Sequence, residues 1–324
     1  DRLGVFDKTL SEQSYGDLTE AGKKGINIKP DESGGWIGLT DKYWMTALLP
    51  DQDQKYNFTF RKLSSNGGQY QTDFLGNAVT ISANSKGEFL SRTFAGAKRL
   101  ALFDEYEQKF NIQHFDLAID FGWFYFLTKP FFYALSWAND YLGNFGLAIL
   151  AITVIVKLLF FPLANKSYKS MAKMRVLTPQ IQKLRERVGD DRQKLNQEMM
   201  NLYKKEKVNP AAGCLPILVQ IPVFFALYKV LFVSIEMRQT PFFGWIKDLS
   251  VQDPTSIFNL FGLLPYSTSF LPDFLNIGIW PLLMGVTMFL QQRLNPTPPD
   301  PIQAKIFAWM PVAFTFLLAT FPAG

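Results

Sequence analysis

The chain has 324 residues, of which 48% are hydrophobic, and its mean hydropathy is close to zero at +0.02. This length leaves room for a water-soluble domain and several membrane spans. The net charge of +5 is concentrated in one segment, so it is no argument for nucleic-acid binding. A single cysteine and a single histidine exclude an intrachain disulfide and the usual Cys/His metal sites, and we expect no metal and no cofactor.

The N-terminal third is polar, turn-rich and patterned like β-structure. Tyr56, Phe58 and Phe60 alternate with polar residues at the period of two that is typical of a half-buried strand, and residues 79–83 repeat the pattern. Short strands of this kind predict a β-sandwich over residues 1–112. No cluster of acid, base and nucleophile stands out, which favours a structural or interaction domain.

Residues 113–143 are unusually aromatic. Charged residues and Pro130 interrupt the stretch, so it is a poor spanning helix. Tryptophan and tyrosine favour the membrane–water interface, and we predict an amphipathic helix lying there. Core packing beneath the β-domain is the alternative.

Four later stretches are apolar enough to predict transmembrane helices. About twenty apolar residues cross the hydrocarbon core of a membrane. The predicted spans are 144–165, 213–235, 274–291 and 305–324. Residues 255–272 are also apolar but are broken by two prolines, and we predict a loop that dips toward the interface. Because the chain starts at Asp1 and ends in an apolar run, we interpret it as a fragment with a truncated last span.

The loops between these spans differ in charge. Segment 166–212 carries twelve basic and five acidic residues, whereas loop 236–273 carries two basic and four acidic residues. The positive-inside rule therefore predicts that 166–212 and the later loop 292–304 are cytoplasmic. Loop 236–273 and the β-domain then lie outside the cytoplasm, which in a bacterium is the periplasm.

The basic segment 166–212 also has helical periodicity. Apolar residues recur at steps of three and four on both sides of a turn at Gly189-Asp190-Asp191, which predicts a helical hairpin. Its basic side chains form a solvated face, or they meet anionic lipid headgroups or ribosomal RNA. The pattern does not separate these interpretations.

Lys157 is the most informative residue, because it is a lone positive charge within a predicted span. An ionisable residue at membrane depth costs roughly 2.5–3.5 kcal/mol on insertion scales. The lysine stem could snorkel to the interface. However, Thr153 lies four residues earlier on the same helical face, and Gln220 lies in the next span. Three polar groups in two spans predict a shared hydrated recess.

Several short motifs in order resemble the YidC/Oxa/Alb family of membrane insertases. The resemblance covers about residues 115–324, and it rests on Ser170-Met171-Ala172-Lys173-Met174, Lys207-Val208-Asn209-Pro210, Gln220-Ile221-Pro222 and Trp309-Met310-Pro311. Gly34-Gly35-Trp36 and Trp44 resemble the C-terminal part of the periplasmic β-sandwich of Gram-negative members. The resemblance implies a membrane anchor before Asp1 and one more span after Gly324.

What the resemblance implies is insertion of newly made proteins into the inner membrane. The expected partners are nascent membrane proteins, the Sec translocon, the ribosome and lipids. The family has an arginine in its intramembrane groove that recruits acidic substrate tails, and Lys157 occupies that position. Thr153, Gln220 and Phe224 match other groove positions. No bond is made or broken, so no catalytic residue is expected.

Two other classes of function remain open from the residues alone. A transporter or channel would need a path through both faces and usually internal repeats, and no repeat is visible between the span pairs. A membrane-anchored glycan-processing enzyme would need paired carboxylates in a cleft, whose geometry the sequence does not give.

Overall fold

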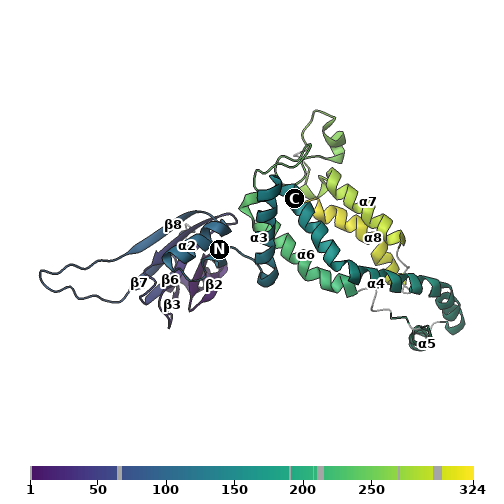
Figure 1. The fold of residues 1–324 in the computed structure, drawn as a ribbon, viewed down its shortest axis with the longest axis horizontal. Helices are drawn as coiled ribbons and strands as arrows, with labels where there is room; N and C mark the ends of the chain where they lie inside the picture. The colour runs from purple at the N-terminus through teal and green to yellow at the C-terminus, as the bar shows by residue number, and fades with distance from the viewer. Residues whose placement is uncertain are drawn as a thin grey trace. The chain divides into compact units, whose positions relative to one another are not determined.

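The computed structural model describes residues 2–63, 68–189, 191–206, 208–209, 215–268, 271–294 and 301–324. The chain divides into two compact units (Figure 1). The β unit comprises Asp1–Trp123 and Val233–Glu236, and the helical unit comprises Phe124–Phe232 and Met237–Gly324.

Two antiparallel sheets build the β unit. The larger sheet has the strand order β2-β1-β4-β5-β8, and the smaller has the order β3-β6-β7. The strands are β1 Arg2–Phe6, β2 Thr9–Gln13, β3 Ile26–Ile28, β4 Trp36–Thr40, β5 Trp44–Pro50, β6 Tyr56–Lys62, β7 Tyr70–Gly76 and β8 Ser91–Ala97. The helical elements are α1 Tyr15–Ala21, η1 Gly22–Lys24, α2 Leu100–Phe110 and η2 Phe115–Ala118. The predicted β-sandwich is confirmed.

Apolar residues from both sheets form the core between them. Phe58 and Phe60 of β6 are fully buried, and their ring centroids lie 4.6 and 6.3 Å from that of Phe6 in β1. Ile37 of β4 and Leu18 of α1 complete this cluster. The apolar residues of the alternating pattern that predicted β6 therefore lie on the strand face that packs against the larger sheet.

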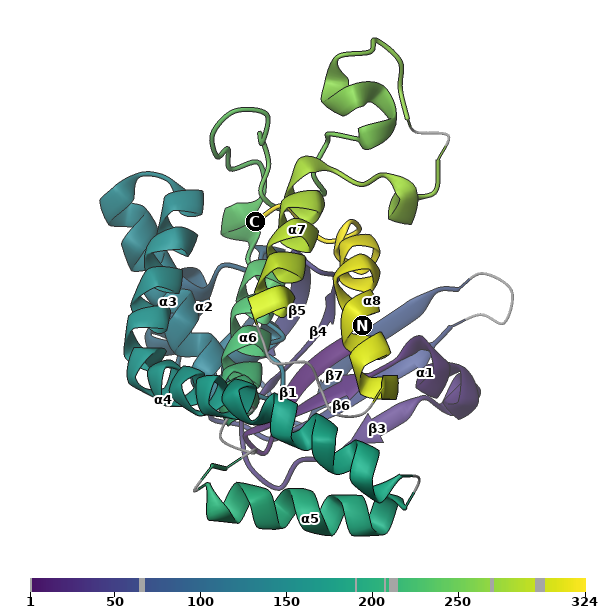
Figure 2. The ribbon, with the colours of Figure 1, turned by 90° about the vertical axis from the view of Figure 1, so that its right-hand side faces the viewer.

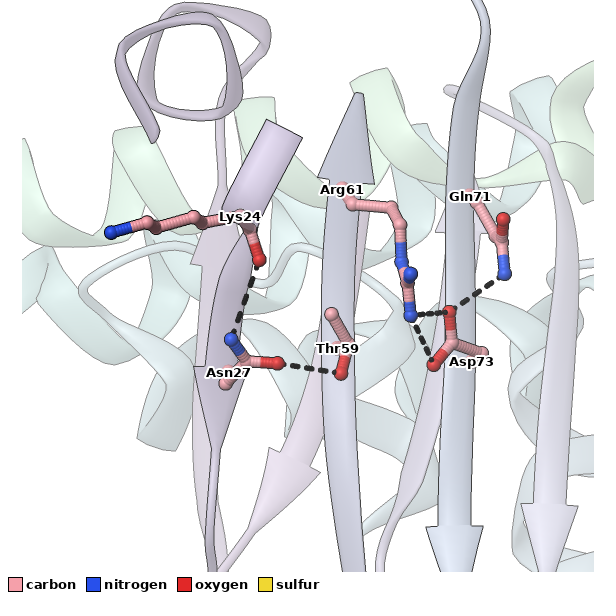
Figure 3. A network of polar contacts seen from close by, with 6 residues as sticks. All are labelled: Lys24, Asn27, Thr59, Arg61, Gln71 and Asp73. Carbon is pink, nitrogen blue, oxygen red and sulfur yellow. Dashed lines mark hydrogen bonds and ion pairs between the residues drawn. The ribbon is translucent and has the colours of Figure 1, made fainter. Parts of the chain in front are cut away.

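The opposite face of the smaller sheet carries a polar network (Figure 3). The Arg61 guanidinium lies 2.8 Å from the Asp73 carboxylate, which also accepts a hydrogen bond of 2.7 Å from the Gln71 amide. Nearby, the Thr59 hydroxyl donates to the Asn27 side chain at 2.9 Å. Successive residues of a strand point to opposite faces, so one strand supplies both the core and this network.

A second aromatic layer covers the other face of the larger sheet. The ring of Phe115 in η2 lies 4.5 Å from that of Phe103 in α2 and 5.5 Å from that of Phe94 in β8. Phe115 is fully buried, so the start of the segment 113–143 packs within the β unit. The helix in that segment begins only at Tyr125.

The strand predicted over residues 79–83 is wrong. Strand β7 ends at Gly76 and β8 begins at Ser91, and the connection between them contains no strand. Val79 is 77% exposed and Ile81 is 58% exposed. An alternating pattern forms a strand only where a neighbouring strand offers hydrogen bonds, and no strand of the described residues pairs with this connection.

Helices make up most of the other unit. They are α3 Tyr125–Leu142, α4 Phe145–Val188, α5 Arg192–Lys205, α6 Leu215–Val233, α7 Ile279–Leu294 and α8 Pro301–Leu318, with short turns η4 Ile235–Met237, η5 Ile257–Gly262 and η6 Asp273–Leu275. Helix α3 packs against α4, and α7 packs against α8 (Figure 2). The predicted helical core is confirmed.

Helix α4 is a single helix of 44 residues. It continues without a break across residue 165, where we predicted the first span to end, and it includes Pro162 and Pro179. It ends at Val188, and the capping residue Gly189 has a φ of 69°, which lies in the left-handed region. Helix α5 then packs against α4, and its N-cap Asp191 accepts a hydrogen bond of 3.0 Å from the Lys194 amide.

Apolar helices recur along this unit. Among the described residues, α4 alone is long and apolar enough, by length and composition, to cross a membrane. Shorter apolar helices cover Leu218–Val233 and Ala304–Leu318.

Candidate functional site

Helix α4 carries two of the predicted groove residues. Thr153 and Lys157 are four residues apart, and both side chains are exposed. Ile152 and Val156 beside them are buried. At 3.6 residues per turn, Thr153 and Lys157 lie about 100° and 140° around the helix from Ile152. The polar pair therefore lies on one face, away from the packed side of the helix.

The ammonium group of Lys157 has no polar partner in the described part of the chain. Neither a hydrogen bond nor an ion pair joins it to another described residue, and the same holds for the Thr153 hydroxyl. A cation at membrane depth is costly unless water or a counter-charge meets it. Both polar groups are therefore exposed and have no partner among the described residues.

Helix α6 carries the other two predicted residues. Gln220 is half-buried and lies in the second turn of the helix. Phe224, one turn later, is 59% exposed. Val223 and Ala226 of the same helix are buried.

The structure does not join the α4 pair to the α6 pair. Within the described residues, no hydrogen bond or ring contact links Thr153 or Lys157 to Gln220 or Phe224. The two helices make little direct backbone contact, whereas α4 packs closely on α3. A recess shared by these four residues stays a prediction.

The arm formed by the end of α4 and by α5 displays the basic residues. Lys183, Arg185 and Lys194 are exposed. Arg187 lies 3.8 Å from Glu198 across the hairpin, and both side chains are well solvated, so this ion pair adds little stability. Burial raises the pKa of Tyr203 in α5 above its ordinary value.

Our sequence reasoning missed the role of Asp253. Its carboxylate accepts hydrogen bonds from the Thr255 amide at 3.0 Å and the Thr255 hydroxyl at 2.6 Å. It also accepts from the backbone amide of Trp280 at 3.1 Å and from the Trp245 indole at 3.2 Å. One side chain thus caps α7 and fixes the loop before it. An aspartate beside Pro254 is a turn signal that could have drawn attention to it.

One cluster of possible metal ligands lies in the β unit. The ligand atoms of Glu107, His114 and Asp116 all lie within 4.8 Å of one another. Asp116 is buried, whereas His114 is exposed. We assign no ion to this cluster, because carboxylates are common at such spacings without one.

Comparison with known proteins identifies the family of this chain. The model of the 60Kd inner membrane protein family matches residues 137–324, which is more than half of the chain. The chain belongs to this family. The model of the YidC periplasmic domain matches residues 2–134. This member of the 60Kd inner membrane protein family is accordingly an inner membrane protein, and its β unit is a periplasmic domain.

Relatives of the 60Kd inner membrane protein family are similar along the whole chain. "Membrane protein insertase YidC" of Brucella suis is 56% identical over 99% of this chain and 52% of its own length. The protein of the same name from Beijerinckia indica is 58% identical over 99% of this chain and 54% of its own. A crystal structure described as an active YidC insertase covers 92% of this chain and 75% of its own, with 20% identity and a TM-score of 0.46. The chain spans about half the length of the curated relatives that it matches.

Proposed function

We propose that the protein inserts newly synthesised proteins into the bacterial inner membrane and helps them to fold. One observation carries this proposal. More than half of the aligned residues, over 99% of the chain, are identical to those of proteins named membrane protein insertase. The activity needs no catalytic residue, because no covalent bond is made or broken.

The proposed substrate groove lies along α4 and α6. Thr153, Lys157 and Phe224 are exposed and Gln220 is half-exposed, so each is available to a passing polypeptide. A hydrated groove part-way through the bilayer shortens the distance that a polar tail must cross. The apolar segment of the substrate then leaves into lipid, where its helical backbone is satisfied.

Lys157 supplies the counter-charge in this mechanism. An acidic tail that enters the groove meets the ammonium group, which no described residue neutralises. The resemblance places arginine at this position in the family. Lysine keeps the charge but lacks the planar fork that binds a carboxylate through two hydrogen bonds. We therefore expect a weak, transient contact, which suits a substrate that must leave again.

The proposed partners follow from the same role. They are nascent membrane proteins, the Sec translocon, the ribosome and membrane lipids. The exposed basic side chains at the end of α4 and in α5 suit phosphate-rich partners such as ribosomal RNA or anionic headgroups.

Reconstitution in liposomes tests the groove. The substrate is a single-span protein with an acidic tail, and the readout is protease-protected tail. At 4 Å the attraction between two unit charges is about 1 kcal/mol in water and about 4 kcal/mol at an effective dielectric of 20. We expect Lys157→Ala to lower insertion about fivefold or more, Lys157→Glu to lower it further, and Lys157→Arg to preserve it.

Two controls separate charge recruitment from damage to the fold. Lys166→Glu changes an exposed lysine of the same helix beyond the predicted span, and it should insert the substrate normally. A substrate with a neutral tail should be insensitive to Lys157→Ala. If both Lys157→Ala and Lys157→Glu insert the acidic substrate as well as the unaltered protein does, the proposed role of Lys157 is wrong.

A further inference from the structure

The connection between α6 and α7 contains a long uncharged stretch. Residues 254–272 include no aspartate, glutamate, lysine, arginine or histidine. We call residues 256–266 the apolar loop. Its exposed large side chains are Phe258, Leu260, Phe261, Leu263, Leu264 and Tyr266, and Leu263 is 82% exposed. Exposed apolar side chains that are close together mark a site of contact with a membrane or another protein. Single exposed apolar residues, in contrast, are normal on a soluble surface.

The backbone of the apolar loop turns these side chains outward. Leu260 and Phe261 have φ of 50° and 59°, in the left-handed region that bulky residues rarely adopt, and Gly262 follows at 96°. In Figures 1 and 2 the connection projects past the N-terminal end of α7. The loop is thus an ordered projection whose tip is apolar.

The loop also satisfies its own backbone. The amides of Phe261, Leu263 and Leu264 donate to carbonyl groups of the loop at 2.7, 3.3 and 3.0 Å. The Gly262 amide donates to the Asn259 side chain at 3.0 Å, and the Tyr266 hydroxyl donates to the Phe258 carbonyl. These bonds lower the cost of bringing this part of the backbone near hydrocarbon, where water is scarce.

The base of the loop is fixed to the start of α7. The Ile257 amide donates to the Ile277 carbonyl at 3.0 Å. The Ser256 hydroxyl donates to the Asn276 side chain at 3.0 Å, and the Thr255 hydroxyl accepts from the Ile279 amide at 3.0 Å. The position of the apolar tip is therefore tied to one end of a helix.

We propose that the apolar loop inserts Leu260, Phe261 and Leu263 among the phospholipid acyl chains of the periplasmic leaflet. The proposal rests on the proposed function and on the predicted spans 213–235 and 274–291, which contain most of α6 and α7 and place loop 236–273 on the periplasmic side. Hydrogen bonds hold the base of the loop at the start of α7, where that helix would enter the membrane, and an uncharged apolar tip fits hydrocarbon. The backbone stays at headgroup level, and the inserted side chains hold α7 at a fixed depth.

Depth-dependent fluorescence quenching tests the insertion. In a Cys214→Ser background, Leu263→Cys carries an environment-sensitive fluorophore, and the complete protein is placed in nanodiscs. We expect loss of fluorescence with lipids brominated on the acyl chains and protection from aqueous iodide. Val251→Cys is the matched control, since Val251 is 50% exposed in the same connection but lies outside the uncharged stretch. It should show the reverse pattern.

A third label separates failure of this inference from failure of the proposed function. Leu158 is 66% exposed on α4, so Leu158→Cys should be quenched by brominated lipid if α4 spans the membrane. Quenching at 158 with iodide access at 263 would overturn the inference alone. Protection of 263 from both quenchers would also overturn it, because protein rather than lipid would then cover the loop. Absence of lipid quenching at both positions would contradict both the placement of α4 across the membrane and the inference.

Discussion

Gly285 in α7 lies in close contact with α8. A Cβ atom added to Gly285 would lie 2.2 Å from the Thr315 hydroxyl oxygen. That hydroxyl cannot swing away freely, because Thr315 is buried and donates to the Pro311 carbonyl at 2.7 Å. The small residue therefore permits a close helix contact, as small residues do in membrane bundles.

We predict that Gly285→Ala destabilises the protein. Alanine gains roughly 0.5–1 kcal/mol over glycine in a helix interior. Overpacking costs about 1–3 kcal/mol, so the clash should outweigh the gain. Thermal unfolding in detergent measures the change. Gly285→Ala combined with Thr315→Ala should be less unstable than the sum of the two single variants. Simple additivity would mean that the two residues do not interact.

Local elements add a pH dependence to the β unit. Helix α1 begins with a capping box, in which the Asp17 amide donates to the Ser14 hydroxyl at 3.2 Å and the Ser14 amide donates to the Asp17 carboxylate at 2.7 Å. The hydrogen bonds with the side chain and backbone of Ser14 lower the pKa of Asp17 below its ordinary value. The carboxylate form is thus the form that stabilises the helix.

We predict that this contribution disappears in acid. A carboxyl whose pKa is lower in the folded state stabilises that state above its unfolded pKa of about 3.9, and the stabilisation is lost as pH falls through the folded value. Asp17→Ala should therefore lower the melting temperature slightly at pH 7. At a pH below the folded-state pKa of Asp17, the variant and the unaltered protein should melt together. A difference that is the same at both pH values would contradict a role for the ionised carboxylate.

At the scale of the whole molecule, charge asymmetry predicts the orientation in the membrane. Twelve basic residues lie in segment 166–212, and two lie in loop 236–273. Basic loops are retained in the cytoplasm. The same asymmetry predicts that the proposed apolar loop meets lipid on the periplasmic side.

We predict opposite accessibility for two exposed lysines. Lys183→Cys and Lys247→Cys are made separately in a Cys214→Ser background and treated with a membrane-impermeant maleimide. Intact spheroplasts should label position 247 only, and inverted vesicles should label position 183 only. Labelling of both positions from one side would show that the segments do not lie on opposite faces.

Features that depend on neighbours in the chain were predictable from the sequence. Alternation identified β6, and the spacing of Thr153 and Lys157 placed both on one face of α4. The turn at Gly189 was expected to end the first arm of the hairpin, and α4 ends there. The first two depend on backbone geometry that repeats every two or 3.6 residues, and the third depends on the left-handed conformation that glycine readily adopts.

Features that depend on contacts between distant residues could be read only from the tertiary structure. Helix α7 begins at Ile279, not at residue 274, because Asp253 and Thr255 cap it from more than twenty residues earlier. Residues 79–83 alternate like a strand but find no partner. Whether Gln220 and Phe224 share a recess with Lys157 likewise depends on how two helices pack. Local periodicity determines the face on which a side chain lies, whereas packing between distant segments determines what that face meets.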